Sequence, residues 1–190
     1  MKILVVASSP NKTGLTAACA EAAVTGIRAA GGEAEEIRLN DLKIDKCHAC
    51  GNGWGTCLRE HRCKEEDDFQ GLHLRLAQAD GYVLVTPVYW GELSESAKAF
   101  TDRLRRCEAT REPGESWLFD KPVIAVAAAG GSGNGMITCL LSMERWIKHV
   151  QARAFDLIAV NRWSRDYKLV AIRAAGEAMS HDLRQKNTRA

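Results

Sequence analysis

Four of the chain's seven cysteines lie in one short segment, Cys47–Cys63, whose sequence is CHACGNGWGTCLREHRC. The spacing is C-x2-C-x6-C-x5-C, and its candidate metal ligands are Cys47, Cys50, Cys57 and Cys63. Thiolates bind zinc and iron–sulfur clusters, and pairs of thiols can form redox-active disulfides. The segment therefore has the residue types for a [4Fe–4S] cluster, an all-cysteine zinc site, a redox dithiol or a metal-free loop.

The spacing of the cysteines bears on these alternatives. A structural zinc site more typically has two C-x2-C pairs, and this segment has one, Cys47 and Cys50. A thioredoxin-like dithiol places its C-x-x-C at a strand-to-helix turn, with few further cysteines. The six residues GNGWGT before Cys57 are glycine-rich enough to loop out and return that thiol to the others. A metal-free loop would instead pack at a subunit interface, with Trp54 as its anchor.

The overall composition is that of one folded domain. The chain has 190 residues, of which 46% are hydrophobic and 26% charged, with a formal net charge of +2. We expect a single domain over residues 1–190, with the cysteine-rich insertion at about residues 43–68. So small a charge gives no case for nucleic acid, and no apolar run approaches the ~20 residues that a membrane span needs. An odd number of cysteines does not suit a secreted disulfide framework, so we expect a cytoplasmic protein.

Apolar β-rich segments alternate with helical patterns along the chain. Strands are expected at residues 2–8, 33–40, 81–88, 121–130 and 154–162, and helices are expected to begin near residues 13, 67, 94, 136 and 166. This alternation predicts an α/β fold, a doubly wound sheet of five parallel strands in the order 2-1-3-4-5 with helices on both faces. Ligands bind at the carboxyl ends of such strands, so a site is expected in the loops after the first, third and fourth strands.

These three loops have residues suited to a phosphorylated aromatic ligand. The first, SSPNKTGLT (8–16), brings hydroxyl and amide groups to a helix N-terminus, which favours a phosphate. The second, TPVYWGELS (86–94), offers two aromatic faces, and the third, AAAGGSGNG (127–135), offers backbone donors without side chains. Taken singly, the first loop also fits a capped strand-to-helix turn, the second fits aromatic side chains that cover the end of the sheet, and the third fits a flexible connection. Neither a P-loop nor a dinucleotide fingerprint follows the first strand.

Together, SSPNKTGLT, TPVYWGELSESAKAFTDR and AAAGGSGNG resemble the three FMN-contacting loops of the NAD(P)H-dependent FMN reductase family. The resemblance runs from Met1 to about Val150, and its most specific piece is residues 87–103. It implies a flavodoxin-like fold, bound FMN, and NADPH or NADH as electron donor. It also implies a homo-oligomer, because members of the family are commonly dimers or tetramers.

The resemblance further implies which residues contact FMN. The phosphate contacts would come from Ser9, Asn11, Thr16 and the Leu15 backbone. The isoalloxazine would lie against Pro87, Val88, Tyr89, Trp90 and Gly91, with Gly131, Ser132 and Gly133 on its other side. Family members often carry Arg where Asn11 stands and Asn where Leu15 stands, so one charged phosphate contact is missing here. Lys12 is a candidate replacement for that charge.

The expected function is that of an oxidoreductase in which FMN takes electrons from a nicotinamide and passes them to a quinone, a flavin or a similar small acceptor. The flavin supplies the chemistry, so no catalytic acid or base is assigned. One alternative is an iron–sulfur flavoprotein that relays electrons through a cluster at Cys47, Cys50, Cys57 and Cys63. Those proteins carry a compact cysteine motif at this point, with two residues between the second and third cysteines, where this chain has six and Gly53 stands at the third position.

A non-catalytic alternative is a flavodoxin-like electron carrier or binding module. Flavodoxin carriers are usually strongly acidic, whereas this chain is slightly basic. The remaining cysteines, Cys19, Cys107 and Cys139, fall in helical patterns and predict small apolar side chains in the core.

Overall fold

The computed structural model describes residues 1–189, and its centre is a parallel sheet. The strands are β1 (Lys2–Ala7), β2 (Glu33–Arg38), β3 (Gly81–Tyr89), β5 (Pro122–Ala129) and β6 (Arg153–Asn161), in the order β2-β1-β3-β5-β6. A two-residue strand, β4 (Glu92–Leu93), pairs antiparallel with the end of β3. Apart from β4, this is the predicted order 2-1-3-4-5, and the predicted fold class is confirmed.

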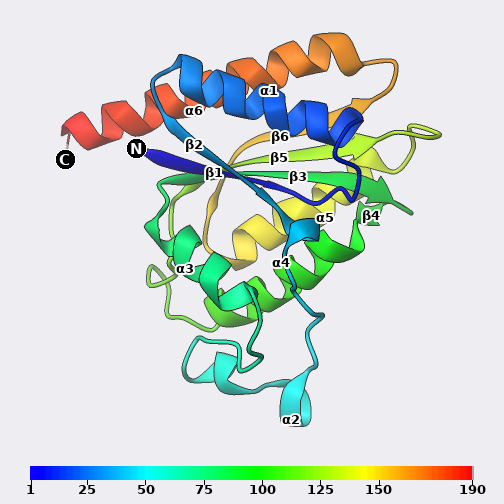
Figure 1. Ribbon diagram of the computed structural model, residues 1–190. Helices are drawn as coiled ribbons and strands as arrows, with labels where there is room; N and C mark the ends of the chain where they lie inside the picture. The colour runs from blue at the N-terminus through cyan, green and yellow to red at the C-terminus, as the bar shows by residue number, and fades with distance from the viewer. Residues whose placement is uncertain (190) are drawn as a thin grey trace.

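Helices cover both faces of the sheet (Figure 1). One face carries α1 (Leu15–Ala29) and α6 (Arg165–Arg189), and the other carries α3 (Phe69–Gln78), α4 (Glu95–Glu108) and α5 (Met136–His149). Two hydrophobic clusters fill the spaces between the sheet and its two helix layers. Single turns occur at η1 (Leu39–Asp41), α2 (Cys50–Gly53) and η2 (Thr56–Leu58).

The burial of each strand follows its place in the sheet. The interior strand β5, PVIAVAAA, is buried at every position, as a strand covered by helices on both faces must be. The edge strand β2, EAEEIR, buries only Ala34 and Ile37. The continuous apolar sequence of β5 and the mixed, polar sequence of β2 therefore match their positions inside and at the edge of the sheet.

Helices α1 and α6 pack closely because two glycines face the contact. A Cβ atom on Gly26 would overlap the Arg173 carbonyl oxygen, and one on Gly176 would lie 3.0 Å from the Ala23 carbonyl oxygen. Both obstacles are backbone atoms, so the helices themselves would have to move apart.

Substituting Gly26 by alanine is expected to lower the free energy of unfolding by about 1–3 kcal/mol, because overpacking outweighs the gain in helix propensity. The matched control is Gly71→Ala in α3, where a new Cβ would meet nothing within 4 Å. That variant is expected to gain roughly 0.5–1 kcal/mol. Urea unfolding of both proteins tests the expectation, and an equal gain in the two variants would contradict it.

The cysteine-rich segment extends away from the layered body, below α3 and α4 in the view of Figure 1. None of residues 43–68 is buried, so the segment has no core of its own. Its conformation must therefore depend on contacts with the neighbouring helices. Ala190, the last residue of the expected domain, lies outside the described residues. Within residues 1–189, no helix has the length and apolar character that crossing a membrane requires.

Candidate functional site

A pocket of about 260 Å³ lies at the carboxyl ends of β1, β3 and β5. Three loops that are far apart in the sequence form its wall, as the sheet order predicts. Its lining residues are Ser9, Asn11, Thr13, Gly14, Leu15, Thr16, Pro87, Val88, Tyr89, Ala128, Gly130 and Gly131. Eight of the twelve residues expected to contact FMN line this pocket: Ser9, Asn11, Leu15, Thr16, Pro87, Val88, Tyr89 and Gly131.

The other four expected residues lie outside the pocket wall. Trp90 is fully exposed at the turn between β3 and β4, and Gly91 packs against Thr138 of α5. Ser132 accepts a hydrogen bond from the Asn134 backbone N–H. Gly133 packs against the ring of Trp163.

The pocket suits an anion although none of its described lining residues is charged. The N-terminus of α1 opens into it, and the first turn of that helix contains no acidic residue. The backbone at Gly14 has φ = 114°, which favours glycine at this position. Ser9 Oγ accepts a hydrogen bond from the Asn11 N–H at 3.2 Å, which leaves the Ser9 hydroxyl proton free for a ligand. These groups are the neutral donors that a phosphate binds.

A buried network of hydroxyl groups joins the first two loops behind the pocket. Ser94 Oγ lies 2.9 Å from Ser8 Oγ and 3.0 Å from the Ser8 carbonyl oxygen, and Thr86 Oγ1 accepts from the Ser94 N–H at 3.1 Å. Ser94 also caps α4 by accepting from the Ala97 N–H. This network was not predicted from the sequence, although Ser94 ahead of a helical pattern is a capping signal.

A second, open groove of about 960 Å³ adjoins the pocket. Tyr89 lines both the pocket and the groove, and Cys47 lines both the groove and a third cavity. Trp90 and Leu93 add apolar surface to the groove, and charges of both signs come from Lys46, Glu95, Lys98 and Asp102. The groove thus connects the pocket with the cysteine-rich segment.

The third cavity, which we call the thiol cavity, is lined by Cys47, Cys50, Cys57, Cys63 and Cys107. All five are free thiols. Its volume is about 20 Å³, enough for about one water molecule. Among residues 1–189, no group of three or more His, Cys, Asp or Glu side chains is placed to hold a metal ion. The structure thus brings the four predicted cysteines to one cavity without forming a metal site.

Cys107 was expected to be a core residue, and the structure gives it a second role. Like Cys19 and Cys139, it is fully buried. Burial, with the nearby Cys63 and Cys57 thiols, raises the pKa of Cys107 to about 12. It lies on α4 at the boundary between the core and the thiol cavity.

A buried arginine holds the cysteine-rich segment against α4. The Arg103 guanidinium donates to both carboxylate oxygens of Asp67, at 2.5 and 2.9 Å, and to the Asp45 carbonyl oxygen at 3.1 Å. Arg103 therefore joins the two ends of the segment. Burial alone would lower the pKa of Arg103, but hydrogen bonding with Asp67 and the nearby Cys63 thiol outweigh it and raise the pKa.

Further contacts fix the middle of the segment. Arg106 donates to the Gly53 carbonyl oxygen and stacks over the Trp54 ring, and Thr110 Oγ1 donates to the Cys57 carbonyl oxygen at 2.9 Å. Gly53, which stands where the related motif has its third cysteine, has φ = 98°. An L-residue such as cysteine would be strained in that conformation.

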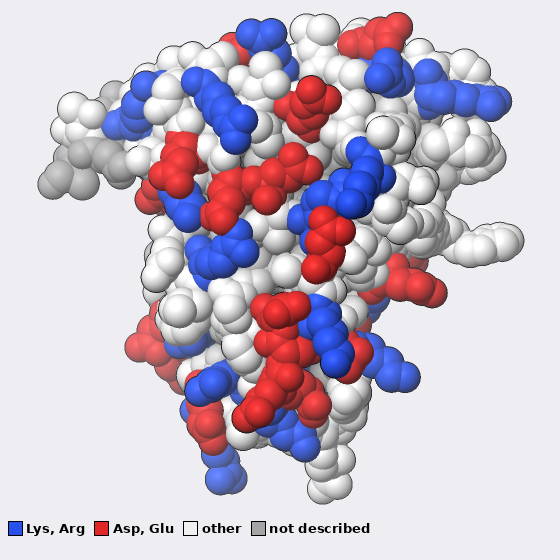
Figure 2. Space-filling view, viewed as in Figure 1, with Lys and Arg blue, Asp and Glu red and all other residues white. Residues whose placement is uncertain are grey.

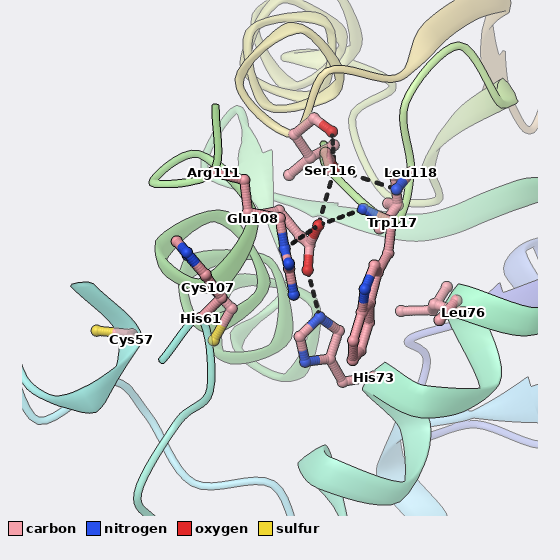
Figure 3. Close-up of polar contacts among 12 residues, drawn as sticks. Cys57, His61, His73, Leu76, Cys107, Glu108, Arg111, Ser116, Trp117 and Leu118 are labelled. Atoms are coloured by element: carbon pink, nitrogen blue, oxygen red, sulfur yellow. Dashed lines mark hydrogen bonds and ion pairs between the residues drawn. The ribbon is translucent and has the colours of Figure 1, made fainter. Parts of the chain in front are cut away.

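Glu108 is the centre of a second buried network, which joins α3, α4 and the loop after α4 (Figure 3). Its Oε1 pairs with His73 Nε2 at 2.6 Å, and its Oε2 accepts from Ser116 Oγ and the Trp117 N–H at 2.8 and 2.7 Å. Arg111 Nε lies 3.2 Å from the same oxygen. Burial alone would raise the pKa of Glu108, but the hydrogen bonds from His73 and Ser116 outweigh it, so the pKa is lowered. 

Replacing Glu108 by glutamine is expected to cost about 3 kcal/mol at neutral pH, because His73 loses its buried partner. A depressed pKa stabilises the folded protein above the unfolded-state value of about 4.3, and the contribution is lost as the pH falls through the folded pKa. The difference in unfolding free energy between the two proteins should therefore shrink below about pH 4.3. Urea unfolding between pH 3 and 7 measures it, with Glu115→Gln, an exposed carboxylate, as control. A difference independent of pH would contradict the assignment.

Comparison with known proteins places this fold and pocket in a family. The family model described as NADPH-dependent FMN reductase matches residues 1–161. An iron–sulfur flavoprotein of Methanocaldococcus jannaschii is 32% identical over 135 residues, which cover 71% of this chain and 65% of that protein. An iron–sulfur flavoprotein of Archaeoglobus fulgidus is 31% identical over 104 residues, which cover 55% of this chain and 46% of that protein. The chain thus matches about half to two thirds of the length of these relatives.

Solved structures support the same fold. A flavone reductase superposes with a TM-score of 0.76 at 19% identity, covering 98% of this chain and 64% of that one. An archaeal flavodoxin superposes with a TM-score of 0.64 at 16% identity, covering 97% of this chain and 99% of that one. The flavodoxin-like sheet, the three-loop pocket at its carboxyl edge and the match over residues 1–161 agree, and the chain belongs to the NADPH-dependent FMN reductase family.

Proposed function

We propose that the protein is an FMN-dependent oxidoreductase that takes electrons from NADH or NADPH and passes them to a quinone, a flavin or a similar small acceptor. The observation that carries this proposal is the uncharged pocket in which the N-terminus of α1 meets the loops after β3 and β5. Its neutral donors suit a phosphate at one end, and Pro87, Val88 and Tyr89 suit an aromatic ring system at the other. FMN would supply the hydride-accepting chemistry.

The residues of the chain would bind and orient the cofactor. Ser9 and Thr16 would donate hydroxyl hydrogen bonds to the phosphate, and the backbone N–H groups at the start of α1 would complete its shell. The open groove beyond Tyr89 would leave the other end of the cofactor accessible to both substrates in turn. We also expect a homo-oligomer and a cytoplasmic location, as the family resemblance and the cysteine content suggest.

Anaerobic mixing with NADH or NADPH tests the proposal. The flavin absorbance should bleach with at least one nicotinamide, and steady-state oxidation with a quinone or ferricyanide should follow ping-pong kinetics. A flavoprotein that neither nicotinamide reduces would contradict the reductase assignment while leaving FMN binding intact.

The charge distribution favours a reductase over an acidic carrier of the flavodoxin type. The net charge is +2, and on the face shown in Figure 2 acidic and basic side chains are interspersed. A carrier that finds its partners by electrostatic steering would need a surface of one sign.

The second candidate function is an iron–sulfur flavoprotein, which the thiol cavity favours. A mononuclear zinc ion needs all its thiolates about 2.3 Å from one point, whereas the thiolates of a [4Fe–4S] cluster bind separate irons and stand further apart. Among the described residues, no three such ligands are placed to hold a single metal ion. The four thiols of the segment nevertheless line one cavity together with Cys107, and Arg103, which also lines it, has a buried Nε without a hydrogen-bond partner. An anionic sulfur centre would provide that partner, although the segment would have to open to admit it.

Iron and acid-labile sulfide assays on anaerobically prepared protein separate the two candidates. On the cluster hypothesis, Cys57→Ser abolishes stoichiometric iron and leaves FMN bound, and Cys139→Ser, a core cysteine away from the cavity, changes neither. Flavin without iron or sulfide in the wild-type protein would decide for the plain FMN reductase.

A further inference from the structure

The pocket proposed for FMN lacks a charged side chain to balance the cofactor phosphate. A phosphate monoester carries about −1.5 to −2 charges at neutral pH. The described lining of the pocket contains only neutral residues. The N-terminus of α1 and the neutral donors of the wall can bind the phosphate, and a cation close behind that wall would strengthen the binding.

Arg38 lies directly behind that wall. It is the last residue of β2 and pairs in register with Ala7, the last residue of β1 before the phosphate loop. Its Nη2 donates to the Ser9 carbonyl oxygen at 3.4 Å, and its Nε donates to Asp41 at 3.2 Å. The Arg38 side chain is 19% exposed, so solvent screens its charge less than that of a free surface arginine.

Asn40 holds the same loop from the neighbouring turn. With its amide nitrogen turned toward the loop, the orientation that gives both amide atoms partners, it donates to the Ser8 and Ser9 carbonyl oxygens at 3.0 and 3.2 Å. The carbonyl and the following N–H of a trans peptide point in opposite directions. With the Ser8 carbonyl held toward Asn40, the Ser9 N–H lies on the opposite side of the loop.

We propose that Arg38, supported by Asn40, is the residue that selects a flavin bearing a 5′-phosphate over an unphosphorylated flavin. Its charge would act on the phosphate from the end of the strand next to the loop. Asp41 reduces the effect, because its carboxylate is paired with the same guanidinium. This inference rests on the proposed FMN site and concerns how that site discriminates between ligands.

Lys12 is the competing source of charge. It belongs to the phosphate loop but is exposed, and it does not line the pocket. An exposed lysine is strongly hydrated and held in no fixed geometry. The structure therefore favours Arg38, and the two residues can be tested with the same substitution.

The test is to titrate flavin-free protein with FMN and with riboflavin, for the wild type and for Arg38→Gln, Lys12→Gln and Asp41→Asn. Arg38→Gln is expected to weaken FMN binding on the order of tenfold and to leave riboflavin binding within about twofold. Lys12→Gln should change neither affinity by more than about twofold. Asp41→Asn should shift the preference the other way, strengthening FMN binding by about threefold. The wild-type preference for FMN should also fall with added salt more steeply than that of Arg38→Gln.

Three outcomes would overturn the inference. Equal weakening of both flavins by Arg38→Gln would show that Arg38 only maintains the loop. Loss of the FMN preference in Lys12→Gln would assign the charge to Lys12, and an unchanged preference in Arg38→Gln would remove the role altogether. Wild-type protein that binds neither flavin would instead overturn the proposed function from which the inference starts.

Discussion

Replacing Ser9 and Thr16 together with alanine is expected to weaken FMN binding by about 3–6 kcal/mol, which is two to four orders of magnitude in Kd. Each hydroxyl would donate one hydrogen bond to a charged phosphate, worth about 1.5–3 kcal/mol. Both residues line the pocket, and its described wall contains no charged side chain that could make up the loss. Isothermal titration of flavin-free protein with FMN measures the effect.

Two controls make this result specific to the phosphate. Thr25→Ala removes a hydroxyl from the exposed side of the same helix and should leave the FMN affinity unchanged. Riboflavin, which lacks the phosphate, should bind the double variant as it binds the wild type. An FMN affinity unchanged in the double variant would remove the phosphate assignment of this loop.

The second large effect is expected at Arg103. Substitution by methionine should lower the free energy of unfolding by about 3–5 kcal/mol, because the nearly buried Asp67 carboxylate is left without its partner. The hydrogen bond from Arg103 helps to keep the pKa of Asp67 low against the opposing effect of its own burial. Losing that bond also releases both ends of the cysteine-rich segment, so proteolytic cleavage within residues 43–68 should become faster.

A surface ion pair on the same helix serves as the control. Lys98 and Asp102 lie 2.5 Å apart on α4, but the two side chains are 51% and 39% exposed. Lys98→Met should therefore cost less than about 1 kcal/mol and leave the cleavage rate unchanged. Similar losses in the two variants would show that the buried pair does not hold the segment.

The sequence predicted the parts of the fold that depend on continuous local patterns. Short apolar runs such as those of β1 and β5, alternating with helical patterns, are typical of buried parallel strands, and right-handed crossovers leave few possible strand orders. The pair β3–β4 was missed, because a ladder of two residues, Glu92 and Leu93, leaves no periodic signal. The three loops were found because each directly follows a buried strand.

Contacts between side chains that lie far apart in the sequence could not be predicted from it. Arg103 was noted as part of a family motif, but nothing in a helical pattern shows that its guanidinium reaches Asp67, 36 residues earlier in the chain. The same holds for Arg38, whose position behind the phosphate loop depends on the pairing of β2 with β1. Cys107 was correctly predicted to be buried, but its contact with the thiol cavity depends on how the inserted segment folds back onto α4.

The most direct test of the account is the identity of the bound flavin. Protein purified with its cofactor is denatured, and the released flavin is separated by chromatography against FMN, FAD and riboflavin standards. We expect FMN, because one phosphate loop is present and no dinucleotide fingerprint accompanies it. FAD as the main species, or no flavin bound even after titration with FMN, would contradict the proposed FMN site.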